Sequence, residues 1–359
     1  MLDGALVIDA VAHSYDFRDT NNASGRYSQA VTDLIFGAHT ALSPAGYRVP
    51  REQFIRDWDV EETANLLFVE SDYDLACHHV LQLSAYHDGG SGLEKAREAK
   101  RRWPDRFIVY AGVDPLQPNA VESLEQQVEE LDPVGLKLYP NSWRGEEVRG
   151  WLMDDPEVAF PLFAKAQQLG LKVVAIHKAV PLGPVPMKHY RMDDLDAAAD
   201  AFPGLAFEVV HGGMAFVEET AWQLARYPNV YVNLEVTASL TMSAPAQFTQ
   251  ALAGMIGPSG PGAIERLLWG TGCSVWHPGP PLEWFWNSFA FPQELLEGFG
   301  LPQIDQDAKR KILGENYARL IGLDVEDAKA RIADDAFARR RAEGKPEPYA
   351  TTRSAGTAG

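Results

Sequence analysis

Three of the nine histidines in this chain stand where short aliphatic runs end. His13 follows one such run, and His177 and His211 each close another. Neutral imidazole nitrogens are good ligands for Zn, Fe and Mn, so three of them brought together would bind a divalent transition metal. The sequence therefore predicts a metal centre, provided that the fold places these three run ends side by side.

Eight aliphatic or β-branched runs alternate with longer amphipathic segments along the chain. Eight βα units in roughly 320 residues predict a (β/α)8 TIM barrel with enlarged loops at its C-terminal face, where barrel active sites lie. Helices are expected at residues 91–102, 121–131, 157–169 and 305–320. Strands are expected at residues 5–11, 64–70, 107–113, 134–139, 172–177, 206–211, 230–235 and 267–271.

Three connections are longer than a barrel needs, at residues 14–62, 178–191 and 273–303. Each follows a predicted strand and should therefore lie at the barrel mouth. The last is rich in aromatic residues, which either pack over the mouth or form a subunit interface. These residues are Trp276, Trp284, Phe285, Trp286, Phe289 and Phe291.

Composition excludes several classes of partner. The 32 basic and 50 acidic side chains give a net charge of −18, which repels nucleic acid and anionic membrane surfaces. No stretch approaches the roughly 18 apolar residues of a membrane span, and only two cysteines are present. We expect a cytoplasmic protein that acts on a small molecule.

The sequence changes character after residue 323. Residues 1–323 are expected to form the barrel, and residues 324–359 a C-terminal extension of mixed charge that is either solvated or wraps a partner subunit.

Other residues are candidates for roles at the mouth. Asp9 shares the inward face of its strand with His13, and it either binds the metal or orients a ligand. Lys137 should point inward and needs a carboxylate partner, a lowered pKa or a modification. Glu70 and Glu235 are expected at strand ends, as oxygen ligands or as ordinary polar residues of the rim.

Five segments, taken in order, carry a family resemblance over residues 1–323. They read VIDAVAH at 7–13, IHK at 176–178, VHGG at 210–213, LLWGT at 267–271 and ILGENYARL at 312–320. As a set they resemble the amidohydrolase-related family, in the branch that contains aminocarboxymuconate-semialdehyde decarboxylase-like enzymes.

The resemblance implies a distorted TIM barrel whose metal is held by a His-x-His pair, by histidines on the fifth and often the sixth strand, and by an aspartate after the eighth. Here Val11 replaces the first histidine of the pair and Gly272 replaces the aspartate. A reduced mononuclear site of His13, His177 and His211 is therefore expected. Cys273, beside Gly272, is either a thiolate ligand or an inert buried thiol.

Three functions follow from the resemblance and these departures. The first is a metal-binding subunit of a hetero-oligomeric non-haem metal enzyme, of hydroxylase or monooxygenase type, paired with a sister amidohydrolase-like subunit and acting on a small carboxylate or amino-acid-like substrate. The second is an independent metal-dependent hydrolase or decarboxylase, as a homo-oligomer for example. The third is a metal-free structural partner barrel.

Overall fold

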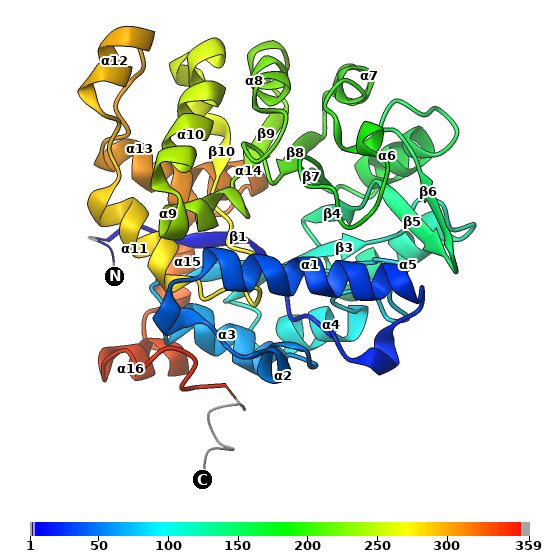
Figure 1. Ribbon diagram of the computed structural model, residues 1–359, viewed down its shortest axis with the longest axis horizontal. Helices are drawn as coiled ribbons and strands as arrows, with labels where there is room; N and C mark the ends of the chain where they lie inside the picture. The colour runs from blue at the N-terminus through cyan, green and yellow to red at the C-terminus, as the bar shows by residue number, and fades with distance from the viewer. Residues whose placement is uncertain (1, 3, 353–359) are drawn as a thin grey trace.

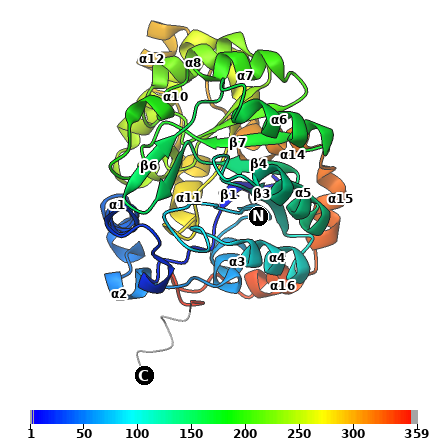
Figure 2. The ribbon, with the colours of Figure 1, turned by 90° about the vertical axis from the view of Figure 1, so that its right-hand side faces the viewer.

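Eight parallel strands close into a barrel in the computed structural model, which describes residue 2 and residues 4–352 (Figures 1 and 2). The barrel closes where Ala12 pairs in parallel with Cys273 and the Gly272 amide donates to the Val11 carbonyl at 2.9 Å. The predicted TIM barrel is confirmed. Its strands are, in spatial order, β1 (Ile8–Ala12), β2 (Leu75–His79), β3 (Phe107–Gly112), β4 (Gly135–Leu138), β7 (Val173–His177), β8 (Ala206–Val210), β9 (Val230–Asn233) and β10 (Leu267–Leu268), and a hairpin of β5 (Asn141–Arg144) and β6 (Glu147–Gly150) lies apart from them.

The prediction of the second strand at residues 64–70 is wrong. Most of that run belongs to helix α3 (Val60–Phe68), which begins at a reciprocal capping box between Asp59 and Glu62. The helix is buried on nearly all sides, and its last apolar residues together with Val69 form a short aliphatic run of the kind that predicts a strand. The true second strand is β2, at Leu75–His79.

Helices surround the barrel (Figures 1 and 2), and the four predicted helical segments are confirmed with shifted ends. None of the helices in the described ranges is long and apolar enough to cross a membrane. Besides α3, the helices are α1 (Arg26–Leu42), α2 (Arg51–Phe54), α4 (Leu93–Arg102), α5 (Ala120–Leu131), α6 (Ala159–Gln168), α7 (Leu195–Ala201), α8 (Val217–Arg226), α9 (Leu240–Ser243), α10 (Pro245–Ser259), α11 (Gly279–Ser288), α12 (Gln293–Phe299), α13 (Gln306–Arg310), α14 (Asn316–Ile321), α15 (Val325–Ile332) and α16 (Ala336–Ala342).

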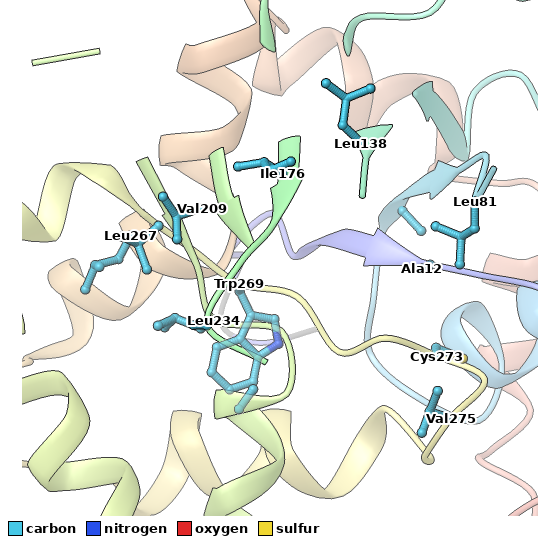
Figure 3. Close-up of a cluster of buried hydrophobic side chains, with 14 of the residues drawn as sticks. Ala12, Leu81, Leu138, Ile176, Val209, Leu234, Leu267, Trp269, Cys273 and Val275 are labelled. Atoms are coloured by element: carbon cyan, nitrogen blue, oxygen red, sulfur yellow. The ribbon is translucent and has the colours of Figure 1, made fainter. Parts of the chain in front are cut away.

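Successive side chains along each strand point alternately to the outer apolar layer and to the barrel interior. Leu138, Ile176 and Val209 belong to one large hydrophobic cluster, part of which is drawn in Figure 3. Their sequence neighbours Lys137 and His177 line a cavity at the mouth instead. The two-residue period of a strand thus supplies both the core and the inward-facing polar groups.

The enlarged loops cover the barrel mouth. Helix α1, from the first long connection, runs across the molecule in Figure 1, and Leu34 and Ile35 on this helix line the cavity below it. His39 fixes the helix, since its Nδ1 pairs with the Val275 carbonyl at 2.8 Å. Of the aromatic residues in the last connection, five are buried within this chain and Trp284 is partly buried, as expected for a loop packed over the mouth.

The C-terminal extension packs on the barrel in its described part, residues 324–352, so the expectation of a solvated segment is not met. Helix α16 lies beside α3 (Figure 1), and Asp335 holds the buried guanidinium of Arg106 at 2.6 and 2.8 Å. Farther on, the Glu70 carboxylate accepts the backbone amides of Tyr349 and Thr351 at 2.6 and 2.8 Å.

Candidate active site

A cavity of about 190 Å³ opens at the C-terminal ends of the barrel strands, beneath α1. Most of its lining is aliphatic or aromatic, and among the described lining residues Lys137 is the only lysine or arginine. An enclosed apolar pocket with a few convergent polar groups is the usual form of a small-molecule site. The polar and aromatic lining residues are His13, Tyr15, Lys137, Tyr139, His177, His211, Glu235 and Trp276.

The backbone turns sharply where four consecutive strands reach this cavity. Ala179, His211, Val236 and Gly272 have φ angles of 61°, 68°, 62° and 68°, and each lies just beyond β7, β8, β9 or β10. Left-handed backbone is costly for any residue except glycine, and such positions gather at functional sites. These unfavourable backbone angles therefore lie at the strand ends from which His211 and Glu235 face the cavity.

The side chains of His177 and His211 meet inside the cavity. His177 Nδ1 lies 2.7 Å from His211 Nε2, and His177 Nε2 lies 2.7 Å from the Val180 carbonyl. A carbonyl only accepts, so a neutral His177 carries its proton on Nε2 and accepts at Nδ1 from His211 Nε2–H. His211 Nδ1 is then unprotonated, and its lone pair points away from His177.

Glu235 lies on the other side of His211. Its Oε2 contacts His211 Nδ1, yet neither atom has a hydrogen-bond partner of correct geometry among the residues described. Burial raises the pKa of Glu235 to about 8, although the charge of Lys137 lowers it. Burial also lowers the pKa of His211 well below its ordinary value. Near pH 7 the Glu235 carboxyl is therefore mostly protonated, and its proton can lie between Oε2 and His211 Nδ1.

His13 follows β1 and is buried at the mouth. Its ring meets His79 edge-on at 5.7 Å between centroids and Tyr15 at 5.2 Å. Its Nδ1 has no hydrogen-bond partner in the described part of the chain. Burial lowers the pKa of His13, so the ring is neutral at physiological pH and able to donate a lone pair.

Lys137 projects inward from β4, as the sequence predicts. Burial lowers its pKa to about 8, while the carboxylates of Glu208 and Glu235 act in the opposite direction. Burial raises the pKa of Glu208 to about 7, and its carboxylate accepts from Asn233 at 2.6 Å and from Tyr110 at 3.1 Å. These charged partners explain how a lysine is kept in an apolar interior.

Asp9 lies below the cavity and does not line it. Its carboxylate accepts the amides of Thr271 and Val11 at 2.9 and 3.1 Å and contacts the Thr271 hydroxyl. Burial raises the pKa of Asp9 to about 7. Asp9 therefore ties β1 to the end of the eighth strand, and in this arrangement it holds the barrel closed.

A sequence model of the family described as Amidohydrolase matches residues 78–323, more than half of the chain. The chain belongs to the amidohydrolase family. No curated protein matches its sequence.

Solved structures share the fold of this chain at low sequence identity. An uncharacterized TIM-barrel protein from Bordetella bronchiseptica has a TM-score of 0.61 at 20% identity, covering 88% of this chain and 98% of its own. The 5-carboxyvanillate decarboxylase from Sphingomonas paucimobilis has a TM-score of 0.52 at 15% identity, covering 89% and 100%. A dihydroxybenzoic acid decarboxylase from a Polaromonas species, solved with bound manganese and the inhibitor 2-nitroresorcinol, has a TM-score of 0.51 at 16% identity, covering 88% and 97%.

The imidazole and carboxyl groups that line the cavity are of the types that bind transition metals. The distances between them, however, are not those of a metal site. No three His, Cys, Asp or Glu side chains in the described ranges are placed to hold a metal ion. A tetrahedral metal with bonds of about 2.0–2.1 Å would set two imidazole nitrogens roughly 3.3 Å apart, so His177 and His211 would have to separate. Both nitrogens of His177 are engaged, so here it orients His211. The ligand set of His13, His177 and His211 stays a prediction.

Two other sequence candidates lie outside the cavity. Glu70 follows helix α3, not a strand, and its carboxylate is engaged by His277 at 3.0 Å and by the C-terminal extension. The expectation that Glu70 ends a strand is therefore wrong, and of its two expected roles the engaged carboxylate favours the ordinary polar one. Cys273 is buried, and burial raises its pKa well above the ordinary value, which favours the inert thiol.

Sequence reasoning missed several residues that shape the site. No strand was predicted over His78 and His79, but they end β2, where His79 stacks on Tyr110 at 4.3 Å. The adjacent run Leu75–Cys77 was the available signal. Tyr139 stacks on His177 at 4.9 Å and follows the strand that carries Lys137. The contribution of α1 had no signal in the sequence, because it depends on how a long insertion folds back.

Proposed function

We propose that this chain is an amidohydrolase-family decarboxylase that removes CO2 from a small, mostly apolar carboxylic acid. The observation that carries the proposal is the largely apolar cavity at the barrel mouth, whose only lysine or arginine, among the described lining residues, is Lys137. The decarboxylases that share the fold support the proposal.

Decarboxylation matches the chemical character of this cavity. A carboxylate held in apolar surroundings loses the hydration that stabilises its charge, which favours departure as neutral CO2. The carbon that loses CO2 must then receive a proton. Lys137, with a pKa of about 8, is an acid suited to neutral pH. Its ammonium group gives up one proton as the carbon–carboxylate bond breaks, and solvent restores that proton before the next turnover.

A divalent transition metal, for which the unpaired imidazole nitrogens of His13 and His211 are suited, would polarise oxygen atoms of the substrate. Manganese in the Polaromonas enzyme supports this part of the proposal, with zinc and iron as the other candidates.

The test is CO2 release from 5-carboxyvanillate and from dihydroxybenzoic acids, using protein loaded with Mn²⁺. We expect release by the wild-type chain and a loss of about 100-fold or more in Lys137→Met. Lys165→Met is the matched control, because Lys165 forms its ion pair with Glu125 outside the cavity. Hydrolysis of an amide or ester without CO2 release would contradict the proposal, as would full activity in Lys137→Met.

A second candidate is the subunit of a hetero-oligomeric non-haem oxygenase, which acts with a sister barrel. Val11 and Gly272 provide no ligand atoms, and no three-donor group in the described ranges is ready for a metal. A partner barrel with a complete ligand set would explain both observations. Mass spectrometry of the protein purified from its native cells would then find a second amidohydrolase-like chain in equal amount, and a homo-oligomer would count against this candidate.

A further inference from the structure

Gly272 and Glu235 compete for one volume beside the cavity. A Cβ atom added at Gly272 would lie 2.0 Å from Glu235 Oε1, 3.0 Å from its Cδ and 3.3 Å from its Cγ. Real Cβ atoms do not approach other atoms so closely, so a side chain at position 272 and the present Glu235 side chain exclude each other. The carboxyl group of Glu235, which extends from the end of β9, fills the space that a side chain after the eighth strand would enter.

Three buried side-chain atoms on residues that line this cavity could bind a metal and have no hydrogen-bond partner among the described residues. They are His13 Nδ1, His211 Nδ1 and Glu235 Oε2. A buried acceptor without a partner is destabilising, because it loses its hydrogen bonds to water and gains none in the protein. His211 Nδ1 and Glu235 Oε2 are close enough to share one proton. A cation bound beside them would take the place of that proton and satisfy both atoms.

We infer that Glu235 is the carboxylate ligand of a divalent metal in this cavity, acting from the seventh barrel strand in the place that Gly272 leaves open. The inference rests on the proposed function, because it adds a ligand to the same site. It explains why position 272 is a glycine, and it brings an oxygen donor to a set that would otherwise contain imidazoles alone. Oxygen from a carboxylate beside imidazole nitrogens suits Mn, Fe and Zn.

The exclusion suggests an exchange experiment. All three atoms closest to the added Cβ belong to the part of Glu235 that Glu235→Ala removes. The pair Glu235→Ala with Gly272→Asp would therefore move the carboxylate from one strand end to the next. The φ of 68° at position 272 adds strain, but aspartate tolerates left-handed backbone better than most residues. Gly272→Asp alone forces the Glu235 carboxyl group to move, because its Oε1 lies 2.0 Å from the added Cβ, and should therefore be less stable than the double variant.

The measurements are Mn²⁺ affinity of the full chain, followed by electron paramagnetic resonance, and melting temperature with and without Mn²⁺. We expect Glu235→Gln and Glu235→Ala to weaken Mn²⁺ binding by tenfold or more. The double variant should regain most of this loss and melt above Gly272→Asp. Glu70→Gln is the control, since its carboxyl group is buried but lies outside the cavity, and its Mn²⁺ affinity should equal that of the wild type.

Several outcomes would overturn the inference. One is wild-type Mn²⁺ affinity in Glu235→Gln, and another is a double variant that binds no better than Glu235→Ala. Absence of Mn²⁺ or Zn²⁺ binding by the wild-type chain would overturn it as well. Metal binding that depends on Glu235 in a chain that releases no CO2 would instead refute the decarboxylase proposal and leave this ligand in place.

Discussion

His177 Nδ1 and His211 Nε2 lie 2.7 Å apart and join two neighbouring strands at the cavity. Because the Val180 carbonyl fixes the proton of His177 on Nε2, this contact directs the free lone pair of His211 toward Glu235. His177 thereby positions a second imidazole, in the way that neighbouring groups orient metal-ligating histidines.

We predict that His177→Ala weakens Mn²⁺ binding by about 10–100-fold, because His211 loses the acceptor that orients it. Isothermal titration calorimetry measures the change. His277→Ala serves as the control, since His277 is also buried but pairs with Glu70 away from the cavity. Equal losses in both variants would show that the effect is general destabilisation.

Helix α1 should contribute directly to substrate affinity. Leu34 lines the cavity but is 43% exposed, so Leu34→Ala should change stability little and lower kcat/KM for a dihydroxybenzoic acid by about tenfold. Phe299→Ala is the matched surface control, with its side chain 71% exposed and outside the cavity. A parallel loss in Phe299→Ala would refute a specific role for the helix.

Asp9 should make the metal-free protein less stable as pH rises. Burial raises the pKa of Asp9 from 3.8 to about 7, so the folded state binds a proton that the unfolded state has released between these values. Its stabilising contribution is complete below about pH 4 and is lost as pH rises toward 7, with a slope of up to about 1.4 kcal/mol per pH unit.

Asp9→Asn should reduce this slope, as measured by urea unfolding at several pH values. Asparagine retains an oxygen that accepts from the Thr271 and Val11 amides. An unchanged slope in Asp9→Asn would show that the group titrates as it does in the unfolded chain.

The C-terminal extension should stabilise the barrel through Asp335. Arg106 is only 2% exposed, so Asp335→Asn leaves a buried guanidinium without its charged partner and should cost about 3 kcal/mol of unfolding free energy. Asp334→Asn is the control, because the neighbouring Asp334 is 89% exposed and pairs with Arg339 at the surface. Chemical denaturation distinguishes the two variants, and a similar small effect in both would contradict the prediction.

The sequence predicts the barrel well because each inward-facing residue is flanked by apolar residues of the outer layer. Leu136 and Leu138 around Lys137 are the clearest case, and seven of eight strands follow such patterns. Helix α3 was predicted as a strand because its last apolar residues form a short buried run. The strand that carries His79 was missed because that run takes the place of the second strand in the prediction.

The candidate site is only partly readable from sequence. The histidines at strand ends identify the mouth, since strand ends converge in a parallel barrel. The roles of Asp9, Glu70 and Glu235 depend on contacts between strands that are far apart in the chain. Exclusion of a side chain at Gly272 by Glu235 involves residues 37 positions apart, and only the three-dimensional structure shows it.

Metal content of the purified chain tests the account most directly. After incubation with excess Zn²⁺, Mn²⁺ or Fe²⁺ and removal of free metal, the wild-type protein should retain about one equivalent of at least one of them. His13→Ala and His211→Ala should retain far less, and Glu70→Gln should match the wild type. Retention of well under one equivalent by the wild-type chain, or a full equivalent in both histidine variants, would contradict the metal centre assigned to this cavity.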